Sequence, residues 1–361
     1  MSGVFLAATG LACVLGRDVP SALASLRRGG VAPTPVEVAP GVRWPVHKLA
    51  LQDGEGDWTP RLQRAVREVV AQTGDWGART APLFVASSSL DIGFMEHAPQ
   101  HQRLGGDLQD FADVVAGALD WQGPVFTVST ACTSALNALL AAADLLRGGE
   151  AAEALVIGAE PDNRFTVAGF GAMQLLAPDG AQPFGAQRNG LVLGEAVAAL
   201  RLRAQPARWQ LLGGSNVVDG RNPSGTEAGA VRAMCHEALA RSGLRPGDID
   251  LIKVQAAGSP VNDAIEAEAL KAVFAPLPPL VSLKSAIGHT LGAAGAAELA
   301  LLVGCLEAGV WPRSDYPLDD TLGVVLSAQV PSGPRAPRHV LLNVVGFGGG
   351  HASLVLRDCG A

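Results

Sequence analysis

The chain has little charge, and the charge that it has is not clustered. Only 17% of its 361 residues are charged, and the formal net charge is −7. No run of Lys and Arg forms a basic face, so binding to nucleic acid is not expected. Apolar residues make up 48% of the chain, which predicts a large and well-buried core.

The five cysteines form no recognisable framework. They stand at positions 13, 132, 235, 305 and 359, and no pair has the spacing of metal ligands. Their odd number argues against a set of disulfides. No Gly-rich phosphate loop follows a strand in the form that a nucleotide site requires. We therefore expect neither a metal nor another cofactor.

The sequence also lacks the marks of a signal peptide and of a membrane span. Its first residues, MSGVFLAATG, have no basic region before an apolar run. The most apolar stretch, 290–310, contains Glu298, Glu307 and many small residues. A buried helix explains this stretch better than a membrane span, and we expect a cytoplasmic protein.

Short apolar runs rich in Val, Ile and Leu alternate with helical stretches, which predicts an α/β protein whose sheets are covered on both faces. Segment 125–150 runs strand, turn, Ala-rich helix and terminal glycine, and segment 279–309 repeats that order at similar length. We therefore predict two similar halves, 1–205 and 206–361, in one compact unit. Their strand-to-helix turns would face one shared pocket.

Cys132 is the candidate nucleophile. It stands in STACTSA, between the run VFTVS and a helix that ends at Gly148 and Gly149. A cysteine at a helix N-terminus feels the positive end of the helix dipole, which would lower its pKa and favour the thiolate. Its own backbone N–H could also hold a developing oxyanion. The other four cysteines are expected to be small core residues.

Several segments, together with TACTSA, resemble the β-ketoacyl synthase family, the condensing enzymes of fatty-acid and polyketide assembly. They are ATGLACVLG near the start, PFGAQRNGLVLGEA (183–196), KSAIGHTLGAAGAAE (284–298) and NVVGFGGGHASLVL (343–356). The resemblance runs in the family's order over nearly the whole chain. It implies a thiolase-like fold, which is a duplicated five-layer α-β-α-β-α sandwich and is normally dimeric. The chain is shorter than typical members between 40 and 85, where family loops often cover the acyl pocket.

The resemblance also implies two-step chemistry. A cysteine thiolate takes an acyl group from a carrier protein; malonyl carrier protein then loses carbon dioxide, and its enolate attacks the acyl-cysteine. Carried over residue by residue, Cys132 matches the nucleophile. His289 matches the second of two histidines that stabilise the enolate, and Lys284 matches the lysine beside them.

The loop GFGG supplies the rest of the implied site. Phe347 matches the residue whose backbone N–H completes an oxyanion hole with that of Cys132 and which often gates the acyl tunnel. Gly346 and Gly348 suit a loop whose backbone must come close to a substrate. After this loop the chain has His351, where the family usually carries Asn.

Gln255 is the main departure from the family pattern. The first histidine normally opens a block of the type His-Gly-Thr-Gly-Thr-Pro-Leu-Asn-Asp, and here the block reads QAAGSPVND. Glutamine keeps an N–H donor but cannot exchange a proton or carry a positive charge. Losing one oxyanion donor lowers a rate by about 10²–10³, and losing a general acid or base lowers it by about 10²–10⁴. We expect slowed condensation, while acylation of Cys132 survives.

Two functions follow from this pattern. The first is a partner of the chain-length-factor type, which pairs with an intact ketosynthase in a heterodimer and acts with acyl- and malonyl-loaded acyl carrier protein. The second is a self-sufficient β-ketoacyl synthase, dimeric with itself, in which Gln255 replaces one catalytic histidine. The missing histidine, the two alanines after Gln255 and the short chain favour the first, which is the function that we expect. Retention of Cys132, Lys284 and His289 favours the second.

Two other enzyme classes remain as alternatives. A thiolase would need a second cysteine in the last loop, where Gly346 and Phe347 stand. An acyltransferase that uses Cys132 without decarboxylation fits the missing histidine.

Overall fold

A computed structural model of the chain describes residues 3–49, 57–97, 107–221, 225–331 and 336–360. In these residues, ten strands form a sheet in the order β11-β10-β12-β13-β9-β1-β8-β6-β4-β5. The strands of the first half are β1 (Val4–Cys13), β4 (Leu83–Ala86), β5 (Val125–Val128), β6 (Glu153–Glu160) and β8 (Ala196–Arg203). Those of the second are β9 (Trp209–Val218), β10 (Leu251–Lys253), β11 (Leu280–Val281), β12 (His339–Val345) and β13 (Gly350–Asp358).

The two halves of the sheet have the same topology. In each half the second strand in chain order pairs in parallel with the third and the fourth, and the fourth pairs antiparallel with the fifth. The fifth strand pairs antiparallel with the first in both halves. The halves join where β1 pairs with β9, from Val4 opposite Leu211 to Leu6 opposite Trp209. The predicted duplication is therefore confirmed, while the boundary between residues 205 and 206 stays a prediction.

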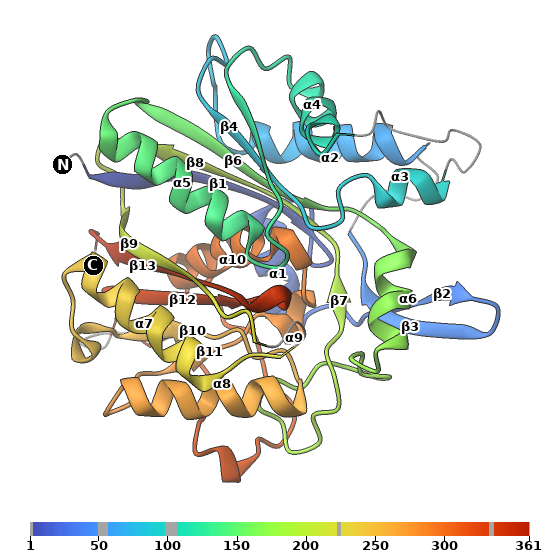
Figure 1. The fold of residues 1–361 in the computed structure, drawn as a ribbon, viewed down its shortest axis with the longest axis vertical. Coiled ribbons are helices and arrows are strands. Elements are labelled where there is room, and N and C mark those ends of the chain that lie inside the picture. Colours follow the sequence, from blue (N-terminus) through green and yellow to red (C-terminus); the bar gives the residue numbers. More distant parts are fainter. Residues whose placement is uncertain (1–2, 50–56, 98–106, 222–224, 332–335, 361) are drawn as a thin grey trace.

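Helices complete the layers, which Figure 1 shows stacked from top to bottom. The outer helices of the first half are α2 (Trp58–Ala71) and α4 (Gln109–Ala118), and those of the second half are α7 (Ala228–Ser242) and α8 (Pro260–Val273). Between the two halves of the sheet lie α5 (Ser134–Gly148) and α10 (Ala294–Ala308), with α1 (Val19–Arg27) against α10. This is the five-layer α-β-α-β-α arrangement that the resemblance implied.

A smaller unit lies beside the layers. It contains a sheet of β2 (Thr34–Ala39), β3 (Val42–His47) and β7 (Leu193–Gly194), together with α6 (Arg164–Ala172) and α3 (Ile92–His97). The short helix α9 (Lys284–Ile287) follows β11. Through β7, this unit reaches the loop that precedes α10, because Leu193 bridges to His289.

Helix α10 is the buried helix predicted for 290–310. In the described part of the chain, Leu291–Ala308 is long and apolar enough to cross a membrane, yet 83% of that window is buried inside the structure. Every residue from Ala294 to Cys305 is buried, including Glu298. The apolar composition is explained because both halves of the ten-stranded sheet and α5 cover the helix.

Glycine allows α5 and α10 to approach closely. A Cβ atom on Gly295 would lie 2.7 Å from the backbone nitrogen of Leu136 on α5. On β6, a Cβ on Gly158 would lie 3.0 Å from the Cα of Ala293 and 3.3 Å from the Cβ of Ala135. Because the two helices pack so tightly near their N-termini, the turns that precede them are brought together.

Replacing Gly295 with alanine should therefore destabilise the fold. Gly→Ala inside an open helix stabilises by up to about 1 kcal/mol, but here the methyl group meets backbone that must shift, and overpacking typically costs about 1–3 kcal/mol. Urea unfolding measures the difference. Gly117→Ala on α4 is the matched control, because a Cβ there meets no atom within 4 Å. Equal stability of the two variants would contradict the close packing of α5 on α10.

Candidate active site

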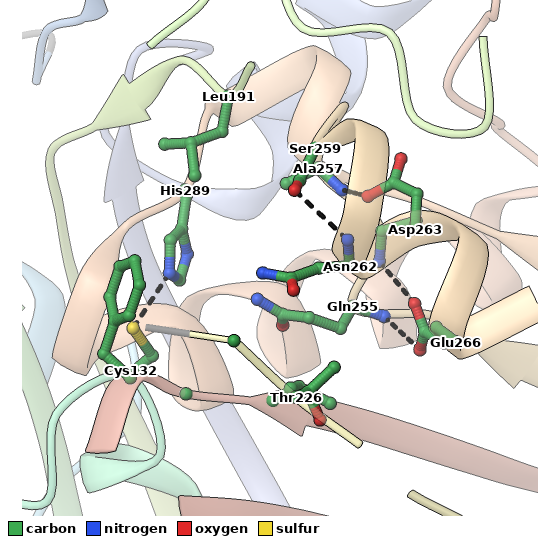
Figure 2. A pocket seen from close by; sticks show the side chains of 15 residues that line it. Cys132, Leu191, Thr226, Gln255, Ala257, Ser259, Asn262, Asp263, Glu266 and His289 are labelled. Atoms are coloured by element: carbon green, nitrogen blue, oxygen red, sulfur yellow. Dashed lines mark hydrogen bonds between the residues drawn. The ribbon is translucent and has the colours of Figure 1, made fainter. Parts of the chain in front are cut away.

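Loops from both halves line one pocket (Figure 2). Cys132 enters it from the first half. Gln255, His289, Gly346 and Phe347 enter it from the second. Five of the seven predicted site residues therefore line this pocket, among them the three side chains, 132, 255 and 289, that were expected to share one small ligand. The shared pocket predicted for the turns of the two halves is present.

Cys132 lies in a tight turn between β5 and α5. Ala131 before it adopts a positive φ of 53°, a conformation that is uncommon for a residue with a side chain. The Ser134 hydroxyl holds the turn, accepting from the Thr130 N–H at 2.9 Å and donating to the Ala131 carbonyl at 2.6 Å. Cys132 thus stands two residues before the first residue of α5, with Thr133 at the N-cap.

His289 faces Cys132 from the loop before α10. Its Nε2 lies 3.0 Å from the Cys132 Sγ (Figure 2). The His289 backbone is fixed on both sides: its N–H donates to Val192 O at 2.8 Å, and its carbonyl accepts from the Gly194 N–H at 3.0 Å. Gly288 is required before it, since φ is +71° and a Cβ would lie 2.6 Å from the Leu193 carbonyl oxygen.

The sulfur and the imidazole are both neutral in this environment. Burial raises the pKa of the Cys132 thiol to about 11, although the Phe347 backbone N–H and the charge of Lys284 act in the opposite direction. Burial likewise lowers the pKa of His289 to about 3, and Lys284 adds to this effect. The expectation of a lowered cysteine pKa is wrong, because loss of hydration outweighs the helix dipole. The resting pair is thiol and imidazole.

Gln255 occupies the wall opposite this pair. Figure 2 shows its side chain projecting into the pocket beside that of Asn262, toward Cys132 and His289. Its Oε1 atom is buried without a hydrogen-bond partner. The backbone is held independently of that side chain, because the N–H groups of Gln255 and Ala256 donate to the two oxygens of Glu266 at 2.8 and 2.7 Å. The position therefore presents an amide to the ligand on a firmly fixed strand end.

The next residues of the block are held in the same way. The N–H groups of Ala257 and Gly258 donate to the carboxylate of Asp263 at 3.1 and 3.0 Å, and Phe184 N–H donates to it at 2.9 Å. Asp263 and Glu266 both lie on α8 and are buried. The aligned Asp and Glu of this block thus fix the loop.

The GFGG loop lies against the nucleophile. Gly346 approaches Cys132 so closely that a Cβ there would lie 3.4 Å from the cysteine nitrogen. Gly348 adopts a φ of +78° and does not belong to the pocket lining. At Gly349, also at positive φ, a Cβ would lie 1.6 Å from the Asp219 carbonyl oxygen. The Phe347 ring packs edge-on against Phe170, with centroids 5.1 Å apart.

Lys284, like Gly348, is a predicted site residue that does not line the pocket. It is fully buried, and its ammonium pairs with Glu298 on α10, which also binds Lys253. Burial lowers the pKa of Lys253 to about 8, while Glu298 acts to raise it. Lys284 therefore influences Cys132 and His289 through its charge rather than by contact.

The lining residues that were not predicted as site residues include Thr226 and Asn262. Asn262 belongs to the aligned QAAGSPVND block, and its place on the first turn of the helix after Gln255 was a usable signal. Thr226 follows β9 in a stretch without any motif, so nothing in the sequence indicates it. In the described residues, no group of three or more His, Cys, Asp or Glu side chains is arranged to hold a metal ion.

Comparison with known proteins gives matches along most of the chain. Residues 96–206 match the family model described as Beta-ketoacyl synthase, N-terminal domain, and residues 212–315 match Beta-ketoacyl synthase, C-terminal domain. Erythronolide synthase EryA2 of Saccharopolyspora erythraea is 33% identical over 75% of this chain and 8% of that protein. Nodulation protein E of Rhizobium sp. (strain N33) is 32% identical over 68% of this chain and 65% of that protein. The chain thus spans less than two thirds of the length of these relatives.

Solved structures share the fold over nearly the full length. A chain of the ketosynthase (ApeO) in complex with its chain length factor (ApeC) from Xenorhabdus doucetiae matches with a TM-score of 0.84 and 26% identity, covering 99% of this chain and 98% of that one. The ishigamide ketosynthase/chain length factor matches at a TM-score of 0.83 and 23% identity, over 99% and 100% of the two chains. The two family models together cover more than half of the sequence, and the chain has the fold of a solved ketosynthase complex. This chain therefore belongs to the β-ketoacyl synthase family.

Proposed function

We propose that this chain is a ketosynthase-like subunit of fatty-acid or polyketide elongation that takes an acyl group from a carrier protein onto Cys132. In this proposal it works in the cytoplasm beside an intact ketosynthase in a mixed dimer, as a chain length factor does. The observation that carries the proposal is the pocket itself. A cysteine and an imidazole are in contact there, and an amide stands where condensation needs a second imidazole.

Acyl transfer needs only groups that are in place. As the Cys132 sulfur attacks the thioester carbonyl of acyl carrier protein, its proton passes to Nε2 of the neutral His289, 3.0 Å away. The backbone N–H groups of Cys132 and Phe347 receive the negative charge on the carbonyl oxygen. When the tetrahedral intermediate collapses, the carrier thiolate leaves and takes the proton from His289.

Decarboxylation of malonyl carrier protein makes a stronger demand. Loss of carbon dioxide leaves a full negative charge on an enolate oxygen, which needs strong donors in a dry site. His289 offers one donor. Gln255 offers a neutral amide that can neither carry charge nor deliver a proton. We infer that this chain transfers acyl groups better than it condenses them.

Similar solved structures support the partner role. Two of the similar solved structures are complexes or pairs of a ketosynthase with a chain length factor. The contact between Cys132 and His289 supports the second candidate, a self-sufficient β-ketoacyl synthase, because a silent partner has no use for a paired nucleophile.

Co-expression with an intact ketosynthase, purified through a tag on one chain only, tests the partner role. The expected product is a stoichiometric mixed dimer that elongates acyl carrier protein. A homodimer that condenses malonyl carrier protein without any partner would refute the role.

Alkylation of Cys132 by iodoacetamide should depend steeply on pH. Because burial places the thiol pKa at about 11 and keeps His289 neutral, the rate should rise about tenfold per pH unit between pH 7 and 10, following the thiolate fraction. Peptide mass spectrometry separates Cys132 from Cys359, the exposed cysteine that serves as the internal control. A rate that is already level near pH 7 would indicate a thiolate–imidazolium pair instead.

Restoring the imidazole by Gln255→His should raise decarboxylation of malonyl carrier protein by about 10²-fold, the scale of one oxyanion donor. Gln255→Leu, which has no donor, should lower it further, and acylation of Cys132 should survive in both variants. The measurements are release of labelled carbon dioxide and the mass of the acyl-protein. If all three proteins release carbon dioxide equally, residue 255 is not what limits the site.

A further inference from the structure

Two side-chain amides stand in the wall of the pocket opposite Cys132 and His289. Figure 2 shows Gln255 with Asn262 beside it, both projecting into the pocket toward the sulfur and the imidazole. They come from different elements, because Gln255 follows β10 and Asn262 lies on the first turn of α8. An acyl group bound at Cys132 therefore shares the pocket with a pair of amides.

The backbone contacts of both residues leave the amides facing the pocket. The Gln255 N–H donates to Glu266 at 2.8 Å, and the Asn262 N–H donates to the Ser259 hydroxyl at 3.3 Å. The Oε1 atom of Gln255 is buried and has no hydrogen-bond partner in the protein. A carboxamide carries an acceptor oxygen and two N–H donors. Whichever way its end is turned, each side chain presents both an acceptor and donors.

The amides distinguish between acyl groups by what each group can pair with. The apolar part of the pocket lining comprises Leu191, Ala256, Ala257, Val345 and Phe347. A plain hydrocarbon chain suits this lining, but it displaces water from the buried Gln255 oxygen and offers no donor in return, which is costly. A ketone accepts from an amide N–H but has no proton to donate. A hydroxyl donates and accepts at once.

We propose that the pocket selects acyl groups that carry a hydroxyl close to the thioester, as 3-hydroxyacyl groups do. The hydroxyl donates to the Gln255 oxygen and accepts from an amide N–H of Asn262. This inference rests on the proposed function, since it requires transfer of the acyl group to Cys132. Gln255 and Asn262 then determine specificity, because an acyl group without the hydroxyl leaves buried polar groups unpaired.

The test compares four pantetheine thioesters on the full chain: (R)-3-hydroxybutyryl, (S)-3-hydroxybutyryl, 3-oxobutyryl and butyryl. The two enantiomers have the same intrinsic reactivity, so any difference between them is due to the protein. Peptide mass spectrometry follows the acylation of Cys132. One enantiomer should react about ten- to hundredfold faster than butyryl, the scale of a buried polar group that gains its partner. The 3-oxobutyryl thioester, which has no donor, should gain much less.

Variants of the two amides locate the origin of this preference. Gln255→Met is similar in size and has no amide, and it should bring the ratio of the preferred enantiomer to butyryl close to one. Asn262→Leu should lower the ratio as well. Val261→Ala, at an exposed position beside Asn262, is the control and should keep the ratio. Thermal unfolding of each variant confirms that it is folded.

The outcomes separate this inference from the proposed function. Equal acylation of Cys132 by butyryl and by both enantiomers would overturn the inference alone, and so would a preference that Gln255→Met leaves intact. If none of the four thioesters acylates Cys132 in the unmodified chain, the proposed function fails as well.

Discussion

The approach of α5 to α10 is the constraint on which the site depends. Both helices lie between the two halves of the sheet, and Gly295 allows their backbones to meet near their N-termini. Cys132 and His289 stand in the turns just before these helices. A contact of 3.0 Å between residues that are 157 positions apart therefore follows from the packing of two helices and not from any local feature. The same packing removes water from both groups.

That burial decides the chemistry of the nucleophile. A helix N-terminus favours a thiolate by about 0.3–1 kcal/mol in exposed settings, whereas burial of an ionised group shifts a pKa by several units. At Cys132 burial prevails, and the thiol stays protonated until the imidazole accepts its proton. The Lys253–Glu298–Lys284 cluster places extra positive charge behind this pair, which helps to keep His289 neutral and available as a base.

In the wall opposite the nucleophile, the groups that fix the backbone are different from the side chain that faces the ligand. Asp263 and Glu266 fix the loop at Gln255 through its backbone N–H groups, so the side chain at 255 can change without moving the loop. An amide at position 255 alters the chemistry that the pocket offers to a bound thioester, and the backbone of the loop stays in place.

The sequence alone determined the α/β class, the two similar halves, the strand-to-helix turn at Cys132 and the residues Gln255, His289 and Phe347 that share its pocket. These features depend on local patterns of apolar residues, on glycine at turns and on motifs that each occupy one short segment. Only the tertiary structure decided the raised pKa of Cys132, the position of Lys284 outside the pocket lining and the contact between Thr226 and His351. Desolvation and long-range contacts depend on which distant segments pack together, and no single stretch of sequence carries that information.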